Sequence, residues 1–217
     1  MEEVVKVKHV WSTPSGDNLI AHMARVSNPS NQDNTATADK LIKYLVTNKH
    51  WSPLDMVDMC VEIETTRDIA RQILRHRSFF FQEFSQRYAD PTKELSFELA
   101  EMRMQDFKNR QNSLEPEPTL GNAMTYDEWQ AAQRDLLTET IKLYNWALGN
   151  GIAKEVARKV LPEGLTNSRM YMKGSVRSWI HYIQVRTDVS TQKEHRKIAE
   201  ACKEILVTQY PSLKELV

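Results

Sequence analysis

The segment from residue 71 to residue 88 carries the densest set of side chains that could bind a ligand. After Arg71, it holds two guanidinium groups around an imidazole, followed by a carboxylate, a hydroxyl and a further guanidinium: Arg75, His76, Arg77, Glu83, Ser85 and Arg87. Arginine pairs with phosphate oxygens through two parallel N–H donors, and a hydroxyl can complete the remaining oxygens. The set therefore predicts a site for a dianionic phosphate beside a planar polar ring.

Two other interpretations fit the same residues. One is a solvated basic helix face followed by a loop that tucks Phe79, Phe80 and Phe81 into the core, and the residues alone favour it because short motifs often match by chance. The three Phe make a ligand site less improbable, because apolar rings beside the charged groups would exclude water and strengthen their contacts with a ligand. The other is a nucleic-acid-binding module that stacks bases on the aromatic rings.

A second cluster of cations lies toward the end of the sequence. Arg177 and His181 are four residues apart and share one helix face, opposite Val176, Ile180 and Ile183. Arg186 ends the same helix, and Arg158 precedes it on a short helix. Between residues 154 and 205 there are 11 Lys and Arg against six Asp and Glu, a local surplus of +5. Without other information, Arg177 and His181 are expected on an exposed surface.

Hydrophobic periodicity predicts the elements that must position these residues. Alternation predicts strands over residues 3–11 and 57–65. Helical spacing predicts helices over 17–27, 37–48, 67–77, 153–160, 175–186 and 190–208. The 67–77 helix would bring Gln72 onto one face with Arg75 and His76, and residues 163–174 are expected to form a loop.

The middle of the chain changes character. Residues 90–122 are polar and interrupted by prolines, so we expect an irregular excursion. A helix is expected to start at Thr125, which forms a capping box with Glu128, and to end at Gly149 and Gly151. Its expected apolar face consists of Trp129, Ala132, Leu136, Tyr144 and Leu148. With no repeat or long linker, the pattern predicts one α+β domain over residues 1–217, with a small, mostly antiparallel sheet flanked by several helices.

Composition limits the classes of function. The 217 residues contain 29 Lys and Arg and 29 Asp and Glu, so the formal net charge is +0, which argues against a chain-wide cationic surface for nucleic acid. No apolar run approaches the roughly 20 residues needed to span a membrane, and the N-terminus does not resemble a signal peptide. We therefore expect a cytoplasmic protein, or one in the host cytoplasm if its source is viral, with no membrane partner.

Metal and thiol chemistry are not expected. The six histidines form no metal-binding pair at helical spacing, and the two cysteines are Cys60 and Cys202. Cys60 lies on a predicted strand flanked by acidic residues, and Cys202 lies on a charged helix without an activating partner. A reactive thiolate needs an electropositive, accessible setting, so we expect both thiols to be inert.

Several ordered segments resemble one family. The sequence Arg75-His76-Arg77 followed after seven residues by Ser85 matches the signature of the flavin-dependent thymidylate synthases. The resemblance continues in family order through Ala24-Arg25-Val26-Ser27, His50-Trp51-Ser52-Pro53, Ala70-Arg71-Gln72, Ser85-Gln86-Arg87-Tyr88, Val156-Ala157-Arg158-Lys159-Val160-Leu161-Pro162 and Arg177-Ser178 through Arg186. Together these blocks cover nearly the whole chain apart from residues 90–124.

The resemblance implies a reaction. It implies reductive methylation of dUMP to dTMP, in which methylenetetrahydrofolate supplies the carbon, reduced FAD supplies the hydride and NADPH re-reduces the flavin. It implies no enzymic Cys nucleophile. Family members are homotetramers with active sites shared between subunits, which implies that Arg158 reaches a neighbour's nucleotide. A flavoprotein of the same fold that has lost methyl transfer is the competing interpretation.

The resemblance also implies the site residues. Flavin contacts are implied for Ser27, His50, Ser52, Asp55, Arg75, His76, Arg77, Glu83, Ser175, Arg177 and His181. Nucleotide contacts are implied for Gln72, Arg75, Glu83, Ser85, Gln86, Arg87, Arg158 and Arg186. Asn often stands where Ser175 falls and Glu where Asp55 falls, so these two positions depart from the family pattern. Arg186 is the expected catalytic residue, because a guanidinium can stabilise negative charge on the uracil ring.

Overall fold

The computed structural model describes residues 6–217, whose contacts form two compact units. The first unit comprises residues up to Ile63, Leu74–Gln82 and Met170–Val217, and the second comprises Glu64–Ile73 and Glu83–Arg169. The prediction of one domain over residues 1–217 stays a prediction, and residues 3–5 of the first expected strand lie outside the described range.

A four-stranded sheet is the central element of the fold. Its strand order is β1 (Lys6–Ser12), β2 (Asp58–Thr66), β6 (Asn167–Ser175) and β3 (Phe80–Glu83). The strand expected over 57–65 is confirmed as β2, where Met59, Val61 and Ile63 are fully buried. The loop expected over 163–174 is wrong over most of its length, because β6 begins at Asn167.

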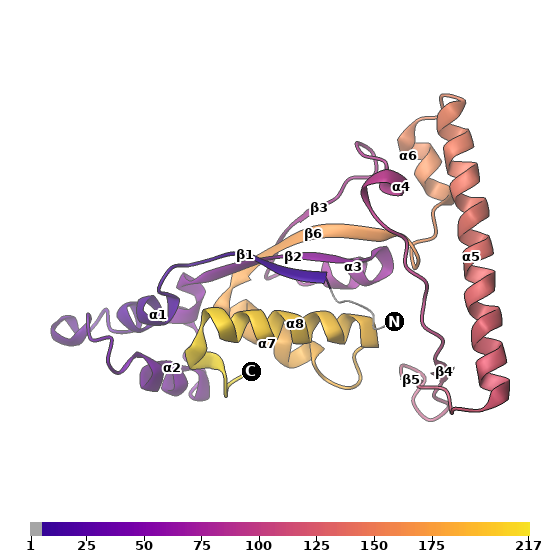
Figure 1. Ribbon diagram of the computed structural model, residues 1–217. Coiled ribbons are helices and arrows are strands. Elements are labelled where there is room, and N and C mark those ends of the chain that lie inside the picture. Colours follow the sequence, from indigo (N-terminus) through magenta and orange to yellow (C-terminus); the bar gives the residue numbers. More distant parts are fainter. Residues whose placement is uncertain (1–5) are drawn as a thin grey trace. The chain divides into compact units, whose positions relative to one another are not determined.

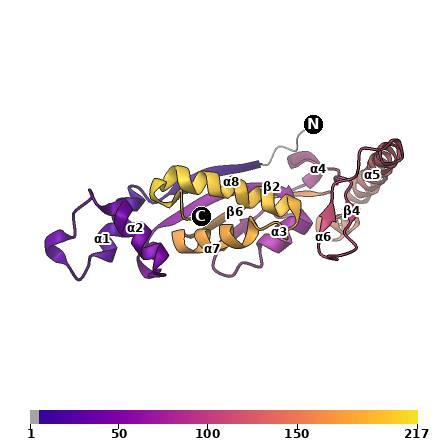
Figure 2. The same ribbon diagram turned by 90° about the horizontal axis from the view of Figure 1, so that it is seen from below.

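Helices α7 (Val176–Arg186) and α8 (Lys193–Gln209) pack against each other in the first unit and lie along the sheet (Figures 1 and 2). Val176, Ile180 and Ile183 are completely buried, as their predicted position on one helix face requires. Helices α1 (Gly16–Ala24) and α2 (Ala38–Thr47) pack together in the same unit. Short 3₁₀ segments occur at Pro29–Asn31, Ser52–Met56 and Pro211–Leu213. Among these helices, α7 carries the expected site residues Arg177, His181 and Arg186.

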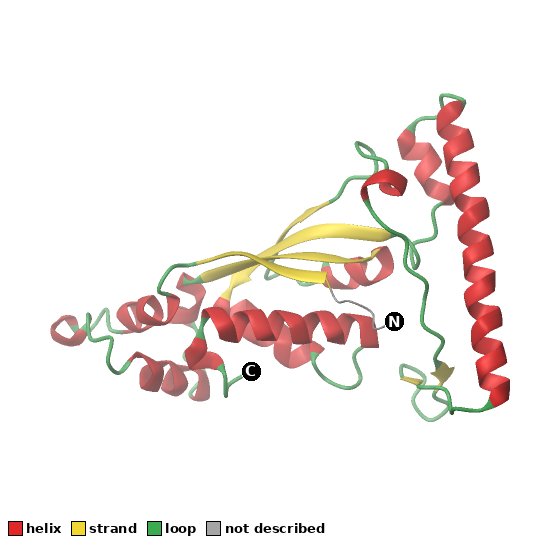
Figure 3. Cartoon of the chain, in the orientation of Figure 1, coloured by secondary structure: helices red, strands yellow, loops and turns green. Residues whose placement is uncertain are grey.

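The second unit contains the longest helix, α5 (Leu120–Gly149) (Figure 3). Tyr144 and Ala147 of α5 pack with Ala157 and Leu161, which lie in or beside α6 (Lys154–Ala157) and the 3₁₀ turn Arg158–Val160. The expected excursion over 90–122 is mostly irregular, with α4 (Pro91–Glu94) and the antiparallel pair β4 (Met104–Gln105) and β5 (Ser113–Leu114). The remaining helix of this unit is α3 (Arg67–Ile73).

Two helix boundaries differ from expectation. Helix α3 ends at Ile73, so Arg75 and His76 lie in the following turn and do not share a helix face with Gln72. Helix α5 begins at Leu120, because the Thr119 side chain caps it by accepting a hydrogen bond from the Asn122 amide. The expected cap, Thr125, lies inside the helix and its hydroxyl donates to the Gly121 carbonyl. Asn150 caps the other end, and Gly151 has the left-handed φ of 75° that glycine accommodates.

The expected apolar face of α5 is only partly buried in this chain. Tyr144 is completely buried, whereas Trp129 and Leu136 are about half exposed, as are Leu143 and Trp146. The face that packs inside the unit instead contains Gln133, Leu137, Thr140, Tyr144 and Ala147. Helix α5 therefore presents a row of large apolar side chains in addition to its buried face.

The observed class is α+β, with a small antiparallel sheet and several helices, as the sequence predicts. Within residues 6–217, none of the helices is both long and apolar enough to cross a membrane.

Candidate functional site

The turn that follows α3 carries the Arg75-His76-Arg77 triplet. Both arginines are exposed, and within residues 6–217 neither side chain has a hydrogen bond or an ion pair. His76 between them is half-buried. The turn therefore presents two uncompensated guanidinium groups, which are suited to an anionic ligand.

An aromatic wall surrounds His76. Its ring meets the Tyr182 ring edge-on at a centroid distance of 4.9 Å and the Phe79 ring at 6.4 Å. Phe79 in turn packs on Trp179 at 4.8 Å. Gly174 makes this arrangement possible, because a Cβ at that position would lie 2.5 Å from the Phe79 ring. Part of the expected dry wall is confirmed, since Phe79 is buried, whereas Phe80 is 72% exposed.

His76 also contacts Arg186, the last residue of α7. The Nε–H of Arg186 donates to Nε2 of His76 over 3.0 Å, so the imidazole must be neutral and carry its proton on Nδ1. Burial, together with the charge of Arg186 and the neighbouring His181, lowers the pKa of His76 to about 4. The imidazole therefore stays neutral at physiological pH.

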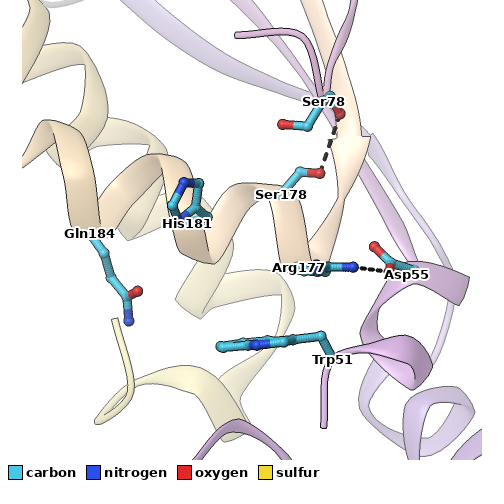
Figure 4. Close-up of a pocket in the computed structure, with 7 residues that line it drawn as sticks. All are labelled: Trp51, Asp55, Ser78, Arg177, Ser178, His181 and Gln184. Atoms are coloured by element: carbon cyan, nitrogen blue, oxygen red, sulfur yellow. Dashed lines mark hydrogen bonds and ion pairs between the residues drawn. The ribbon is translucent and has the colours of Figure 1, made fainter. Parts of the chain in front are cut away.

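A cavity of about 470 Å³ lies beside α7 in the first unit (Figure 4). It is lined by Trp51, Asp55, Ser78, Arg177, Ser178, His181 and Gln184. Arg177 and His181 lie on one helix face and are exposed, as predicted, and both line this cavity. The cavity combines an ion pair between Arg177 and Asp55 with an imidazole, two hydroxyls, an amide and an indole, which suits a planar, polar ligand.

Asp55 and Ser175 hold the cavity wall in place. Asp55 accepts hydrogen bonds from Arg177 Nη1 at 3.0 Å and from the Ser175 hydroxyl at 2.8 Å. Ser175 also caps α7 by accepting from the Ser178 amide at 3.3 Å. Both side chains therefore position Arg177 in this structure. Their expected flavin contacts stay predictions.

Three other expected flavin contacts are exposed residues of the first unit. Ser27 follows α1 in a turn, while His50 and Ser52 flank Trp51. The buried Arg25 ties the turn after α1 to the following loop through bonds to the Asn34 carbonyl and the Thr37 hydroxyl. The Ala24-Arg25-Val26-Ser27 block thus fixes the position of Ser27.

The second unit holds Glu83, Ser85, Gln86 and Arg87 at the end of β3. Glu83 accepts a hydrogen bond from Ser168 at 2.7 Å, and its carboxylate lies 3.7 Å from Arg67. Gln86 is only 3% exposed, and its buried Nε2 has no hydrogen-bond partner within residues 6–217. Such an orphan donor costs free energy unless a ligand or water satisfies it, so Gln86 fits a ligand contact.

Arg87, Arg158 and Gln72 complete the expected nucleotide contacts. Arg87 is exposed, 3.4 Å from Glu155, and its backbone amide donates to the Ser85 hydroxyl. Arg158 lies half-buried in the 3₁₀ turn after α6, and Gln72 is half-buried on α3. The structure brings Ser85, Gln86 and Arg87 together in one turn.

The cysteines lie away from solvent. Cys202 is completely buried and Cys60 is 6% exposed. Burial raises the pKa of the Cys60 thiol and raises that of Cys202 much further. Their expected inertness is consistent with this setting, because thiols in apolar surroundings do not form nucleophilic thiolates.

Sequence reasoning missed four residues of the cavity: Trp51, Ser78, Ser178 and Gln184. Gln184 could have been found from its spacing, because it lies one helical turn beyond His181 on the face of Arg177. Trp51 belongs to the matched His50-Trp51-Ser52-Pro53 block, but its apolar side chain suggests a core residue.

Comparisons with known proteins agree on one family. A family model described as thymidylate synthase complementing protein matches residues 9–212. The probable flavin-dependent thymidylate synthase of Paramecium bursaria Chlorella virus 1 is 49% identical over 199 residues, covering 92% of this chain and 89% of the relative. The flavin-dependent thymidylate synthase of a Synechocystis strain is also 49% identical over 199 residues, covering 92% and 88%.

The fold resembles that of a solved structure. A UMP/dUMP methylase, PolB of Streptomyces cacaoi, crystallised with 5-Br dUMP, aligns with a TM-score of 0.80 and 24% identity. The alignment covers 99% of this chain and 94% of that protein.

Proposed function

This chain belongs to the flavin-dependent thymidylate synthase family, and on that premise we propose that it converts dUMP into dTMP by methylating C5 of the uracil ring. The observation that carries the proposal is the 49% identity to two relatives over nearly the full length of both chains. The uncompensated Arg75 and Arg77 and the cavity beside α7 support it.

The residues of the first unit fit a flavin. Trp51 gives the cavity a flat aromatic surface, and Arg177, paired with Asp55, also lines it. Arg75 and Arg77, which have no ion pair within residues 6–217, are proposed to supply the positive charge that a pyrophosphate needs. Ser27, His50, Ser52 and His181 complete the proposed FAD contacts, with Glu83 from the second unit. When bound, reduced FAD supplies the hydride of the reaction.

The resemblance supports the following proposed nucleotide contacts. Ser85, Arg87 and Arg158 would hold the phosphate and so limit the entropy loss of the reacting ring. Gln72, Arg75, Glu83 and Gln86 would hold the rest of the nucleotide, and a ligand contact would satisfy the orphan Nε2 of Gln86. Arg186 would stabilise negative charge at the uracil carbonyls after loss of the N3 proton, which makes C5 more electron-rich.

Family membership extends the proposal to the partners. Methylenetetrahydrofolate is the proposed carbon donor and NADPH the proposed reductant of the flavin. A homotetramer with shared sites is proposed because α5 exposes Trp129, Leu136, Leu143 and Trp146, and rows of large apolar side chains commonly mark protein interfaces. The cytoplasmic location stays a prediction from the sequence.

Two measurements test the function. The purified protein should show the absorption of oxidised flavin, and with dUMP labelled by tritium at C5 it should release tritium to water and form dTMP. A flavin spectrum without tritium release would instead indicate a flavoprotein of this fold that has lost methyl transfer.

A further inference from the structure

A buried polar cluster lies next to His76. Tyr182 of α7 is completely buried, and so is His195 of α8. Nε2 of His195 lies 3.1 Å from the Tyr182 hydroxyl, and the His76 and His195 rings meet edge-on at 6.2 Å. The cluster therefore links α8, through α7, to the turn that carries Arg75-His76-Arg77.

Arg186 ends this chain of contacts. Within residues 6–217, the only hydrogen bond of its side chain runs from Nε to His76, so both Nη nitrogens keep their N–H donors available. A guanidinium fixed at Nε and open at both Nη groups can present two parallel donors to a planar ligand edge. His76 thus determines the direction in which the Arg186 fork points.

We propose that His76 is a positioning residue, whose neutral imidazole, backed by Tyr182 and His195, aligns the Arg186 guanidinium with the uracil ring. The inference rests on the proposed role of Arg186 in the methylation of dUMP. It assigns to His76 a contact with a protein side chain, where family resemblance implies a contact with flavin.

The neutral state of His76 is essential to this role, because an imidazolium cannot accept the Arg186 Nε–H. The ionisable groups that face His76 are Arg186, Tyr182 and His181 of α7 and His195 of α8. Within residues 6–217, none of these groups is a carboxylate, so none of them favours protonation of His76. Burial, together with the charge of Arg186 and the neighbouring His76, lowers the pKa of His195 to about 3, so both imidazoles are neutral beside the charged Arg186.

Substitutions of His76 separate positioning from flavin binding. In the flavin-loaded protein, His76→Leu should slow methyl transfer roughly 100-fold, the scale of misplacing a catalytic group by about 1 Å. His76→Gln should recover most of that loss, because its carboxamide oxygen can accept the Nε–H. Flavin affinity and flavin reduction should change little in both variants. Equal losses in both half-reactions, or a His76→Leu variant with unchanged methyl transfer, would overturn the proposal.

The tautomer of His76 can be observed without any turnover. Nitrogen-15 NMR of the histidine-labelled, flavin-loaded protein should show a His76 ring protonated at Nδ1 and bare at Nε2 at neutral pH. A His76 protonated at Nε2 contradicts the proposal. If wild-type protein releases no tritium from C5-labelled dUMP, the proposed function fails, and this spectrum still decides the His76–Arg186 bond.

A pH profile tests the backing residues. His195→Ala opens a polar cavity behind His76, and water entering it should raise the His76 pKa toward its ordinary value of about 6.5. Methyl transfer should then fall as the pH drops from about 8 to about 6, while wild type stays flat over that range. Leu206→Ala, a matched cavity three turns further along α8, should lower stability but keep the profile flat. A flat profile for His195→Ala would show that His195 does not maintain the neutral state.

Discussion

Only the Nε of the Arg186 guanidinium is bound to the protein within residues 6–217, so its two Nη groups can contact the substrate. Substitution of Arg186 should therefore affect the chemical step. Arg186→Ala should slow methyl transfer by at least ~100-fold, on the scale of losing one donor that stabilises developing charge. Reduction of the flavin by NADPH should change much less, because that half-reaction forms no pyrimidine anion. Rapid-mixing measurements of the two half-reactions check this.

Arg87→Ala should show the opposite pattern to Arg186→Ala. Arg87 is exposed and assigned to the phosphate, so its loss should weaken dUMP binding more than it slows the chemical step. Equal losses in both half-reactions for Arg186→Ala would instead indicate a flavin-binding or structural role.

The two cysteines should be dispensable for chemistry. Because burial raises the pKa of both thiols, the double variant Cys60→Ala with Cys202→Ala should keep methyl transfer. Its stability should fall by roughly 1 to 3 kcal/mol, since both side chains fill the core. dTMP formation and urea unfolding measure the two effects. A folded, flavin-loaded double variant without methyl transfer would contradict a mechanism free of enzymic thiols.

At the scale of elements, the free energy of unfolding should depend on pH through the buried histidines at α7 and α8. Burial lowers the pKa of His195 to about 3 and that of His76 to about 4, whereas both titrate near 6.5 when unfolded. The unfolded chain therefore binds more protons below about pH 6.5, and the free energy of unfolding should fall there by up to roughly 1.4 kcal/mol per pH unit and histidine. Above about pH 7 it should be constant with respect to these groups.

Urea unfolding at about pH 7.5 and about pH 5.5 measures this slope. His195→Leu removes one of the two titrating groups, so its stability should depend less steeply on pH than that of wild type. The same slope in both proteins would mean that His195 is protonated in the folded state.

The elements also show what the sequence could predict. Strand β2 and helices α2, α7 and α8 follow their hydrophobic periodicity, because each buries one face or alternate residues. Strand β6 was missed because Asn167, Ser168 and Arg169 open it, and sheet pairing rather than propensity holds them extended. The start of α5 was misplaced because two threonines, Thr119 and Thr125, both offer a cap and only the structure selects one.

Some features of the candidate site follow from local sequence patterns, and others depend on contacts between distant residues. Arg177 and His181 share the helix face that their spacing predicts, since helix geometry is local, whereas the cavity that they line could not be predicted from that spacing. The contact of Arg186 with His76 joins residues 110 positions apart, so no local pattern could reveal it. Likewise, the bond from Ser175 to Asp55 depends on how α7 packs against a distant 3₁₀ turn.

At the scale of the whole molecule, the exposed row on α5 should control assembly. Trp129, Leu136 and Leu143 recur every seven residues and therefore lie on one side of the helix. Leu136→Glu places a charge in the proposed subunit interface and should dissociate the proposed tetramer. Thr138→Glu adds the same charge on the opposite side of α5 and should leave assembly intact. Sedimentation of the flavin-loaded wild type and both variants measures their oligomeric state. A monomeric wild type would contradict the proposed tetramer.

Trp51 gives the cavity an optical signal of its own. Its indole lines the cavity, whereas Trp179 is completely buried in the aromatic wall. A flavin bound beside Trp51 absorbs where indole emits, so the emission of this residue should be quenched as the cofactor enters. Titrating the cofactor-free protein would then report occupancy of the cavity through light emission alone, and Trp51→Phe would identify which fluorophore responds.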